Sequence, residues 1–123
     1  MATRMAESLS VLIVEDEPLI AMMLEDLVDS LGHRVAGTAD SVDVALARVA
    51  EGGFNLAILD VQLRGGQPSW PVADALSDRG VAFLLSTGGH LEPPPARHAD
   101  ARVLAKPFTI DSVEAALNEH AAK

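Results

Sequence analysis

Polar residues that suit phosphoryl chemistry follow four short apolar runs of the chain. They are the pair Glu15 and Asp16, then Asp60, Thr87 and Lys106. In open α/β sheets, ligands bind outside the carboxyl ends of the strands, so we expect these residues to converge there. Clustered carboxylates repel one another unless a cation binds, and an all-oxygen site selects a hard ion such as Mg²⁺. Beside that ion, Asp60 has the chemistry of a carboxylate nucleophile that forms an acyl phosphate, with Lys106 spreading the charge.

The elements that must position these residues are strands alternating with helices. Apolar runs predict strands at Val11–Val14, Arg34–Thr38, Leu56–Leu59, Val81–Leu85 and Val103–Ala105. Helical spacing predicts helices at Pro18–Leu31, Ser41–Glu51, Pro71–Arg79 and Thr109–Ala122. In the first helix the predicted buried stripe is Ile20, Met23, Leu24, Leu27, Val28 and Leu31. The alternation predicts an α/β fold with a parallel sheet, right-handed crossovers and helices on both faces.

One segment interrupts the alternation. Gly88–Arg102 falls where a fourth helix is due, but it contains three successive prolines, Pro93 to Pro95. Because proline lacks an N–H and clashes with the preceding turn, a regular helix is excluded there. We expect a loop with at most one helical turn, at Ala96–Ala99.

Composition excludes several classes of function. The chain has 123 residues, a formal net charge of −9 and no cysteine. An acidic chain does not neutralise nucleic-acid phosphates or bind an anionic membrane, and disulfides are impossible. No apolar run approaches the ~20 residues of a membrane span, and no signal-peptide core is visible. We expect a cytoplasmic protein with an N-terminal tail at 1–8 and a single domain at 9–123, without an output domain.

The combined motifs resemble the receiver domain of two-component response regulators. They are the run Val11-Leu-Ile-Val-Glu-Asp-Glu-Pro18, then Asp60, Thr87, and Lys106-Pro107-Phe108, in sequence order. The resemblance implies a flavodoxin-like, five-stranded parallel sheet of order 2-1-3-4-5. The segment Val81 to His90, followed by prolines, is similar to the alphaproteobacterial single-domain receivers nicknamed FAT GUY.

The resemblance also implies a role for each residue. Asp60 would accept a phosphoryl group from a phosphohistidine on a sensor kinase or a histidine phosphotransfer protein. Glu15 and Asp16 would hold Mg²⁺ with Asp60, and the backbone carbonyl of Gln62 would be a further ligand. Thr87 would be the switch hydroxyl and Lys106 the phosphate-pairing cation. Such a chain is a regulator and not an enzyme.

Other residues carry predictions about partners and switching. Val103 replaces the usual aromatic switch residue, so we expect Gly88–Arg102 to switch instead between order and disorder. Docking of the phosphodonor is predicted at Leu19, Met22, Pro107 and Phe108, and the downstream protein is not named by the sequence. Trp70 is predicted to anchor the loop before the third helix. His33, His90, His98 and His120 lack metal-ligand spacing and are predicted to be surface residues.

Three alternatives stay open. The first is a receiver-like binding module that acts without phosphorylation. The second is a Mg²⁺-dependent aspartyl-phosphate phosphatase, although Gln62 occupies the position of the second Asp that such enzymes usually need. The third is a flavodoxin, although no Ser/Thr-Gly phosphate loop follows the first predicted strand.

Overall fold

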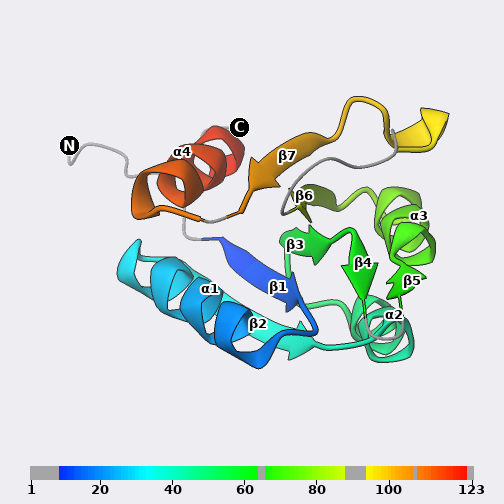
Figure 1. Ribbon diagram of the computed structural model, residues 1–123, viewed down its shortest axis with the longest axis horizontal. Helices are drawn as coiled ribbons and strands as arrows, with labels where there is room; N and C mark the ends of the chain where they lie inside the picture. The colour runs from blue at the N-terminus through cyan, green and yellow to red at the C-terminus, as the bar shows by residue number, and fades with distance from the viewer. Residues whose placement is uncertain (1–8, 64–65, 88–93, 107, 122–123) are drawn as a thin grey trace.

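The computed structural model describes residues 9–63, 66–87, 94–106 and 108–121. Its main sheet contains five parallel strands in the order β2-β1-β3-β6-β7. The strands are β1 (Ser10–Val14), β2 (Arg34–Ala39), β3 (Leu56–Asp60), β6 (Ala82–Thr87) and β7 (Arg102–Ala105). Counted along the chain, these five strands have the predicted 2-1-3-4-5 order, and the flavodoxin-like α/β fold is confirmed (Figure 1).

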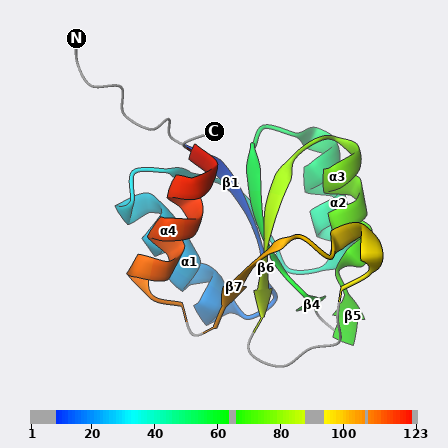
Figure 2. The same ribbon diagram turned by 90° about the horizontal axis from the view of Figure 1, so that it is seen from above.

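In the described ranges, four α-helices cover the two faces of the sheet, as Figure 2 shows. They are α1 (Pro18–Ser30), α2 (Val42–Glu51), α3 (Trp70–Asp78) and α4 (Ile110–Ala121). Helices α1 and α4 lie on one face, and α2 and α3 lie on the other. None of the helices in the described ranges is both long and apolar enough to cross a bilayer.

The buried strands divide their side chains between two cores. In β1, Val11 and Ile13 pack on the side of α1 and α4, whereas Leu12 and Val14 pack on the side of α2 and α3. Successive strand residues point to opposite faces, so a strand covered on both faces is apolar throughout. β3 follows the same rule, since Leu56–Asp60 is buried along its whole length.

Local signals fix the helix ends. Pro18 begins α1, where its missing N–H is not needed, and Gly32 just past the helix takes a φ of +87° that other residues rarely adopt. Ser41 Oγ accepts the N–H of Val44 at 3.2 Å and caps α2. Thr109 Oγ1 accepts the N–H of Ser112 at 3.0 Å before α4.

The first helix is more exposed than its spacing predicts. Only Leu24 and Val28 are buried, and Met23 is 37% exposed, so the prediction that Met23 belongs to the buried stripe is wrong. α1 therefore contacts the sheet through a narrow stripe centred on Leu24 and Val28. Ile20, Leu27 and Leu31 pack against the core only partly.

An antiparallel hairpin was not predicted. Strands β4 (Gln62–Leu63) and β5 (Gln67–Pro68) pair just after β3, on the path to α3. Ser69 fastens this hairpin, because its N–H and its Oγ both donate to the Val61 carbonyl, at 2.9 and 3.1 Å.

The connection between β6 and β7 contains one short turn in its described part. This turn is η2 (Ala96–His98), which agrees with the prediction of at most one helical turn there. Residues 88–93, including His90, lie outside the described residues, as do the tail at 1–8 and the side chain of His120.

Two histidines are buried, so the prediction that they lie on the surface is wrong. His98 is stacked on Trp70, packs edge-on against Phe83, and its Nε2 lies 2.7 Å from Asp74 Oδ1. Trp70 therefore contacts the segment after β6, and it also packs against the core cluster that contains Val61 and Leu63, which precede α3. His33 accepts the Leu9 N–H at Nδ1, 2.9 Å away. Both rings have an apolar body and a hydrogen-bonding partner, which makes their burial affordable.

Candidate functional site

The carboxyl edge of the sheet brings the polar strand-end residues together. Glu15 follows β1 directly, and Asp60 is the last residue of β3, in register with Ser86 of β6. Thr87 ends β6, and its carbonyl accepts the N–H of Lys106 at 2.8 Å. Pairing between neighbouring strands therefore fixes the backbone positions from which these side chains project.

Alternation along the strands gives three of these side chains a common face. The residues two positions earlier, Ile13, Ile58 and Leu104, all belong to the core beneath α1 and α4. Because side chains two apart share a face, Glu15, Asp60 and Lys106 project from that same face of the sheet. The apolar floor beneath them removes water and strengthens their electrostatic interactions.

The acidic cluster consists of three carboxylates. Glu15, Asp16 and Asp60 each offer one oxygen, and these oxygens lie within 4.8 Å of one another. The Glu15 side chain is 1% exposed and that of Asp60 is 12% exposed. Glu15 Oε2 accepts the N–H of Glu17 at 3.1 Å, which fixes the orientation of the carboxylate.

The environment favours a proton or a cation on Glu15. Burial raises the pKa of Glu15 to about 7 from its ordinary value of 4.5, the backbone hydrogen bond from Glu17 opposes the rise, and the nearby charge of Asp60 adds to it. A carboxyl group with this pKa is ionised only at a cost in the free protein. The ionised carboxylates of the cluster therefore repel one another unless a positive charge lies beside them.

Lys106 supplies part of that counter-charge. Its Nζ lies 3.1 Å from Glu15 Oε1 and donates to Asp60 Oδ2 at 3.3 Å. The contact with Glu15 is an ion pair without the alignment of a hydrogen bond, and Oε1 has no hydrogen-bond partner among the described residues. Burial alone would lower the pKa of Lys106, but the contact with Glu15 and the charge of Asp60 outweigh it and raise that pKa. Lys106 is thus held in its charged form between two carboxylates.

The structure places Thr87 and Gln62 near the cluster in the chain, but no contact described here tests the roles predicted for them. Thr87 is half-buried at the end of β6, and Gln62 begins β4 two residues after Asp60. The hydroxyl of Ser86, next to Asp60 in register, is buried and has no hydrogen-bond partner in the described part of the chain. Ser86 was not singled out from the sequence, although its place two residues after buried Leu84 predicts that it faces the same core.

The predicted docking residues have different surroundings. Leu19 and Met22 are 74% and 55% exposed on α1, as a docking role requires. Phe108 is 8% exposed and packs in the core with Val113, so it is not available to a partner and that prediction is wrong. It acts as an apolar staple at the start of α4. Pro107 lies outside the described residues.

The fold and the acidic cluster with its lysine define a signal receiver domain, and comparison with known proteins agrees. Residues 11–67 match the response regulator receiver domain family. The chain is 53% identical to SdrG from Sphingomonas melonis Fr1, with a TM-score of 0.80 over 93% of this chain and 96% of that one. The chain therefore belongs to the response regulator receiver domain family.

Two further relatives are informative. The BeF3-activated conformation of SdrG from Pseudomonas melonis Fr1 is 52% identical, with a TM-score of 0.77 over 94% of this chain and 98% of that one. The phyllosphere-induced regulator PhyR of Methylorubrum extorquens is 35% identical over 122 residues, which cover 89% of this chain. The chain spans 42% of the length of PhyR. These similarities support a regulatory role of the response-regulator kind.

Proposed function

We propose that the chain accepts a phosphoryl group on Asp60, in a Mg²⁺-dependent reaction, from a phosphohistidine of a sensor kinase or histidine phosphotransfer protein. The phosphorylated form then signals by contact with another protein or passes the phosphoryl group on. The observation that carries this proposal is the Lys106 ammonium held between Glu15 and Asp60 in an acidic cluster. A carboxylate nucleophile, a cation and metal-binding oxygens in one place are the components of acyl-phosphate formation.

The residues fit a magnesium ion. All three donors are carboxylate oxygens within 4.8 Å of one another, and hard oxygen ligands are those that Mg²⁺ prefers. Glu15, Asp16 and Asp60 would hold the ion, with the Gln62 carbonyl as a further ligand. When bound, Mg²⁺ supplies charge neutralisation for the transferring phosphoryl group.

The protein's own groups perform the transfer. An Asp60 carboxylate oxygen attacks phosphorus, a P–O bond forms, and the P–N bond breaks with its electron pair returning to the imidazole of the donor. Lys106 is close enough to Asp60, at 3.3 Å, to follow the new phosphoryl oxygens and pair with them. The hydroxyl of Thr87, at the end of the adjacent strand, would donate to another phosphoryl oxygen.

A relative supports this chemistry. SdrG adopts a BeF3-activated conformation, and trifluoroberyllate is a negatively charged group with the shape of a phosphoryl group. That protein is 52% identical to this chain and is covered almost completely by it. We infer that the acidic edge of this chain responds to a phosphoryl group in the same manner.

A transfer assay tests the proposal. A phosphorylated histidine phosphotransfer domain is mixed with the chain, with Mg²⁺ or with EDTA, and the label is followed. We expect label on the wild type only with Mg²⁺, and no label on Asp60→Asn. Asp29→Asn, which removes an exposed carboxylate at the far end of α1, is the matched control and should be labelled. Equal labelling of Asp60→Asn, or labelling in EDTA at the full rate, would contradict the proposal.

A further inference from the structure

Ser86 carries a buried hydroxyl beside the acidic cluster that the proposed reaction does not use. The residue is 1% exposed, and its Oγ has no hydrogen-bond partner in the described part of the chain. A buried hydroxyl without a partner has lost its hydrogen bonds to water and has none in their place, so such groups are rare in folded proteins. This hydroxyl therefore points to a partner that is in place at another stage of the protein's cycle.

The strand that carries Ser86 lies between the strands of Asp60 and Lys106. β6 pairs with β3 on one side and with β7 on the other, and Ser86 is in register with Asp60 and with Leu104. Residues in register on neighbouring parallel strands project from the same face of the sheet, about 4.8 Å apart. Of these two neighbours Leu104 is apolar, so Asp60 is the one to which the hydroxyl can donate.

A serine at this position can reach the carboxylate of Asp60 by rotation about a single bond. The staggered rotamers place Oγ in three directions around the Cα–Cβ bond, and the two short side chains together span the gap between adjacent strands. In the free protein, Lys106 Nζ already donates to Asp60 Oδ2 at 3.3 Å. The hydroxyl of Ser86 is thus a second donor beside a carboxylate whose first donor is a mobile lysine.

We propose that Ser86 is a further catalytic residue, whose hydroxyl donates to the Asp60 oxygen that is not bonded to phosphorus and so sets the lifetime of the acyl phosphate. The proposal rests on the proposed function and deepens it. Once Lys106 pairs with the phosphoryl oxygens, it no longer serves the remaining oxygen of Asp60. The hydroxyl of Ser86, one strand away, takes its place, and both groups then have a partner.

This hydrogen bond assists the loss of the phosphoryl group. Water attacks phosphorus, and the bond between phosphorus and the Asp60 oxygen breaks with its electron pair returning to the carboxylate. Both protons of the water remain on the phosphate product. Negative charge grows on the Asp60 oxygens in the transition state, where a hydroxyl donor binds more strongly than it binds the uncharged acyl carbonyl. Ser86 therefore shortens the life of the phosphorylated state.

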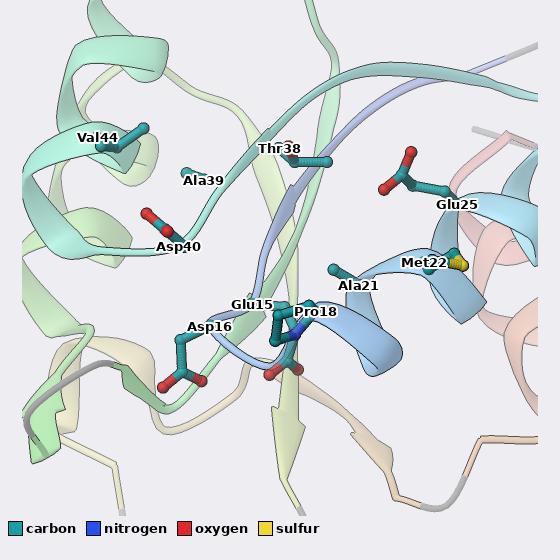
Figure 3. A pocket seen from close by; sticks show the side chains of 10 residues that line it. All are labelled: Glu15, Asp16, Pro18, Ala21, Met22, Glu25, Thr38, Ala39, Asp40 and Val44. Atoms are coloured by element: carbon teal, nitrogen blue, oxygen red, sulfur yellow. The ribbon is translucent and has the colours of Figure 1, made fainter.

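An effect of Ser86 on the path of water is a different explanation, and the geometry disfavours it. A pocket of about 560 Å³ between α1 and the start of α2 is lined by Glu15 and Asp16 (Figure 3). Ser86 is not among the described residues that line this pocket, and β3 with Asp60 separates β6 from β1. Replacement of Ser86 by alanine leaves this open side of the cluster as it is.

The lifetime of the acyl phosphate tests the proposal. The full chain is phosphorylated with phosphoramidate and Mg²⁺, the donor is removed by gel filtration, and the remaining label is followed over time. We expect Ser86→Ala to keep its phosphoryl group severalfold longer than wild type, up to about tenfold, which is the range for one charge-assisted hydrogen bond in the transition state.

Three other variants separate the hydroxyl from the shape of the side chain. Ser86→Cys has a similar shape and only a weak donor, so it should decay as slowly as Ser86→Ala. Ser86→Thr keeps the hydroxyl and should decay at close to the wild-type rate, with circular dichroism confirming that each variant is folded. Ser10→Ala is the matched control, because it removes a strand hydroxyl at the opposite end of the sheet, and it should decay like wild type.

Infrared spectroscopy of the acyl carbonyl reports the hydrogen bond directly. Loss of the donor should move the carbonyl stretch of phosphorylated Asp60 to higher frequency in Ser86→Ala, whereas wild type and Ser10→Ala should share one band. A merely structural role of Ser86 would not move this band. Without phosphate, Ser86→Ala should be no less stable in urea than wild type, because the hydroxyl has no partner among the described residues in that state.

The outcomes that overturn the proposal differ from those that refute the proposed function. A lifetime that is unchanged or shorter in Ser86→Ala, or a carbonyl band that does not move, would overturn the proposal. Equal slowing in Ser86→Thr would overturn it as well, because the shape of the residue and not its hydroxyl would then be responsible. Absence of any label on the wild type would refute the proposed function itself, and the inference about Ser86 with it.

Discussion

Replacement of Glu15 by glutamine should stabilise the metal-free protein at neutral and alkaline pH. Glu15 is buried beside Asp60, and its pKa is raised to about 7 from 4.5. A carboxyl group whose pKa is raised on folding stabilises the folded protein at a pH below the pKa of the unfolded state. This stabilisation is lost as the pH rises through the pKa of the folded state. Glutamine retains a carbonyl oxygen for the Glu17 N–H and carries no charge to bury.

The size of the effect follows from the two pKa values. At about 1.4 kcal/mol for each pH unit between 4.5 and about 7, ionised Glu15 costs about 3 kcal/mol at pH 8. At pH 5.5 the folded protein keeps Glu15 mostly protonated, and the same relation gives about 1 kcal/mol. This balance already contains the attraction of Lys106, because that contact is one of the causes that set the pKa.

Urea unfolding in EDTA at both pH values measures the difference. Glu15→Gln should be more stable than wild type by about 3 kcal/mol at pH 8 and by about 1 kcal/mol at pH 5.5. Glu17→Gln is the control, because Glu17 is exposed and its change should be within about 0.5 kcal/mol at either pH. Saturating Mg²⁺ should reduce or reverse the gain, since the ion stabilises wild type by binding the folded state.

Two results would refute this reasoning. A Glu15→Gln variant that is less stable than wild type at pH 8 in EDTA would show that the ion pair with Lys106 outweighs burial. A gain that does not change between pH 5.5 and 8 would show that ionisation of Glu15 is not its cause.

Three further predictions concern other residues. Burial lowers the pKa of His33 below 6.5, so the stability that the neutral ring contributes is complete above pH 6.5 and is lost as the pH falls. In urea, the free energy of unfolding of wild type should therefore exceed that of His33→Gln by less at pH 5 than at pH 7.5. An equal difference at both pH values would contradict the prediction. His98→Ala removes the ring stacked on Trp70 and should cost about 2 kcal/mol with a shift of Trp70 emission, so an unchanged emission spectrum would exclude the contact. Lys106→Met frees the carboxylate oxygens that Nζ contacts, so this variant should bind Mg²⁺ severalfold more tightly than wild type and accept phosphoryl groups more slowly. Weaker Mg²⁺ binding by calorimetry would show that Lys106 and Mg²⁺ do not compete for these oxygens.

Much of the fold could be predicted because its signals are local. Continuous apolar runs such as Leu56–Leu59 are long enough to identify a strand that is covered on both faces, and Pro18 and Gly32 mark the two ends of α1. The three prolines from Pro93 exclude a regular helix without any knowledge of tertiary structure. The acidic cluster followed from one rule, that polar residues at the ends of parallel strands meet at one edge.

Other features depend on contacts between distant segments. The burial of His98 requires Trp70, Asp74 and Phe83, which belong to α3 and β6, so the spacing of histidines in the sequence does not contain it. The hairpin of β4 and β5 has two residues in each strand, too few for any periodicity. The pocket lined by Met22 of α1, Thr38 of β2 and Val44 of α2 likewise exists only once these separate segments have packed on the sheet.

The identity of the phosphorylated residue is the most direct test of the central claim. The chain is incubated with phosphoramidate and Mg²⁺, the acyl phosphate is trapped by borohydride reduction, and the modified residue is located by tandem mass spectrometry. The account predicts a single modification at Asp60, with none when EDTA replaces Mg²⁺. A modification at Asp16 or at any other carboxylate, with Asp60 unmodified, would contradict it.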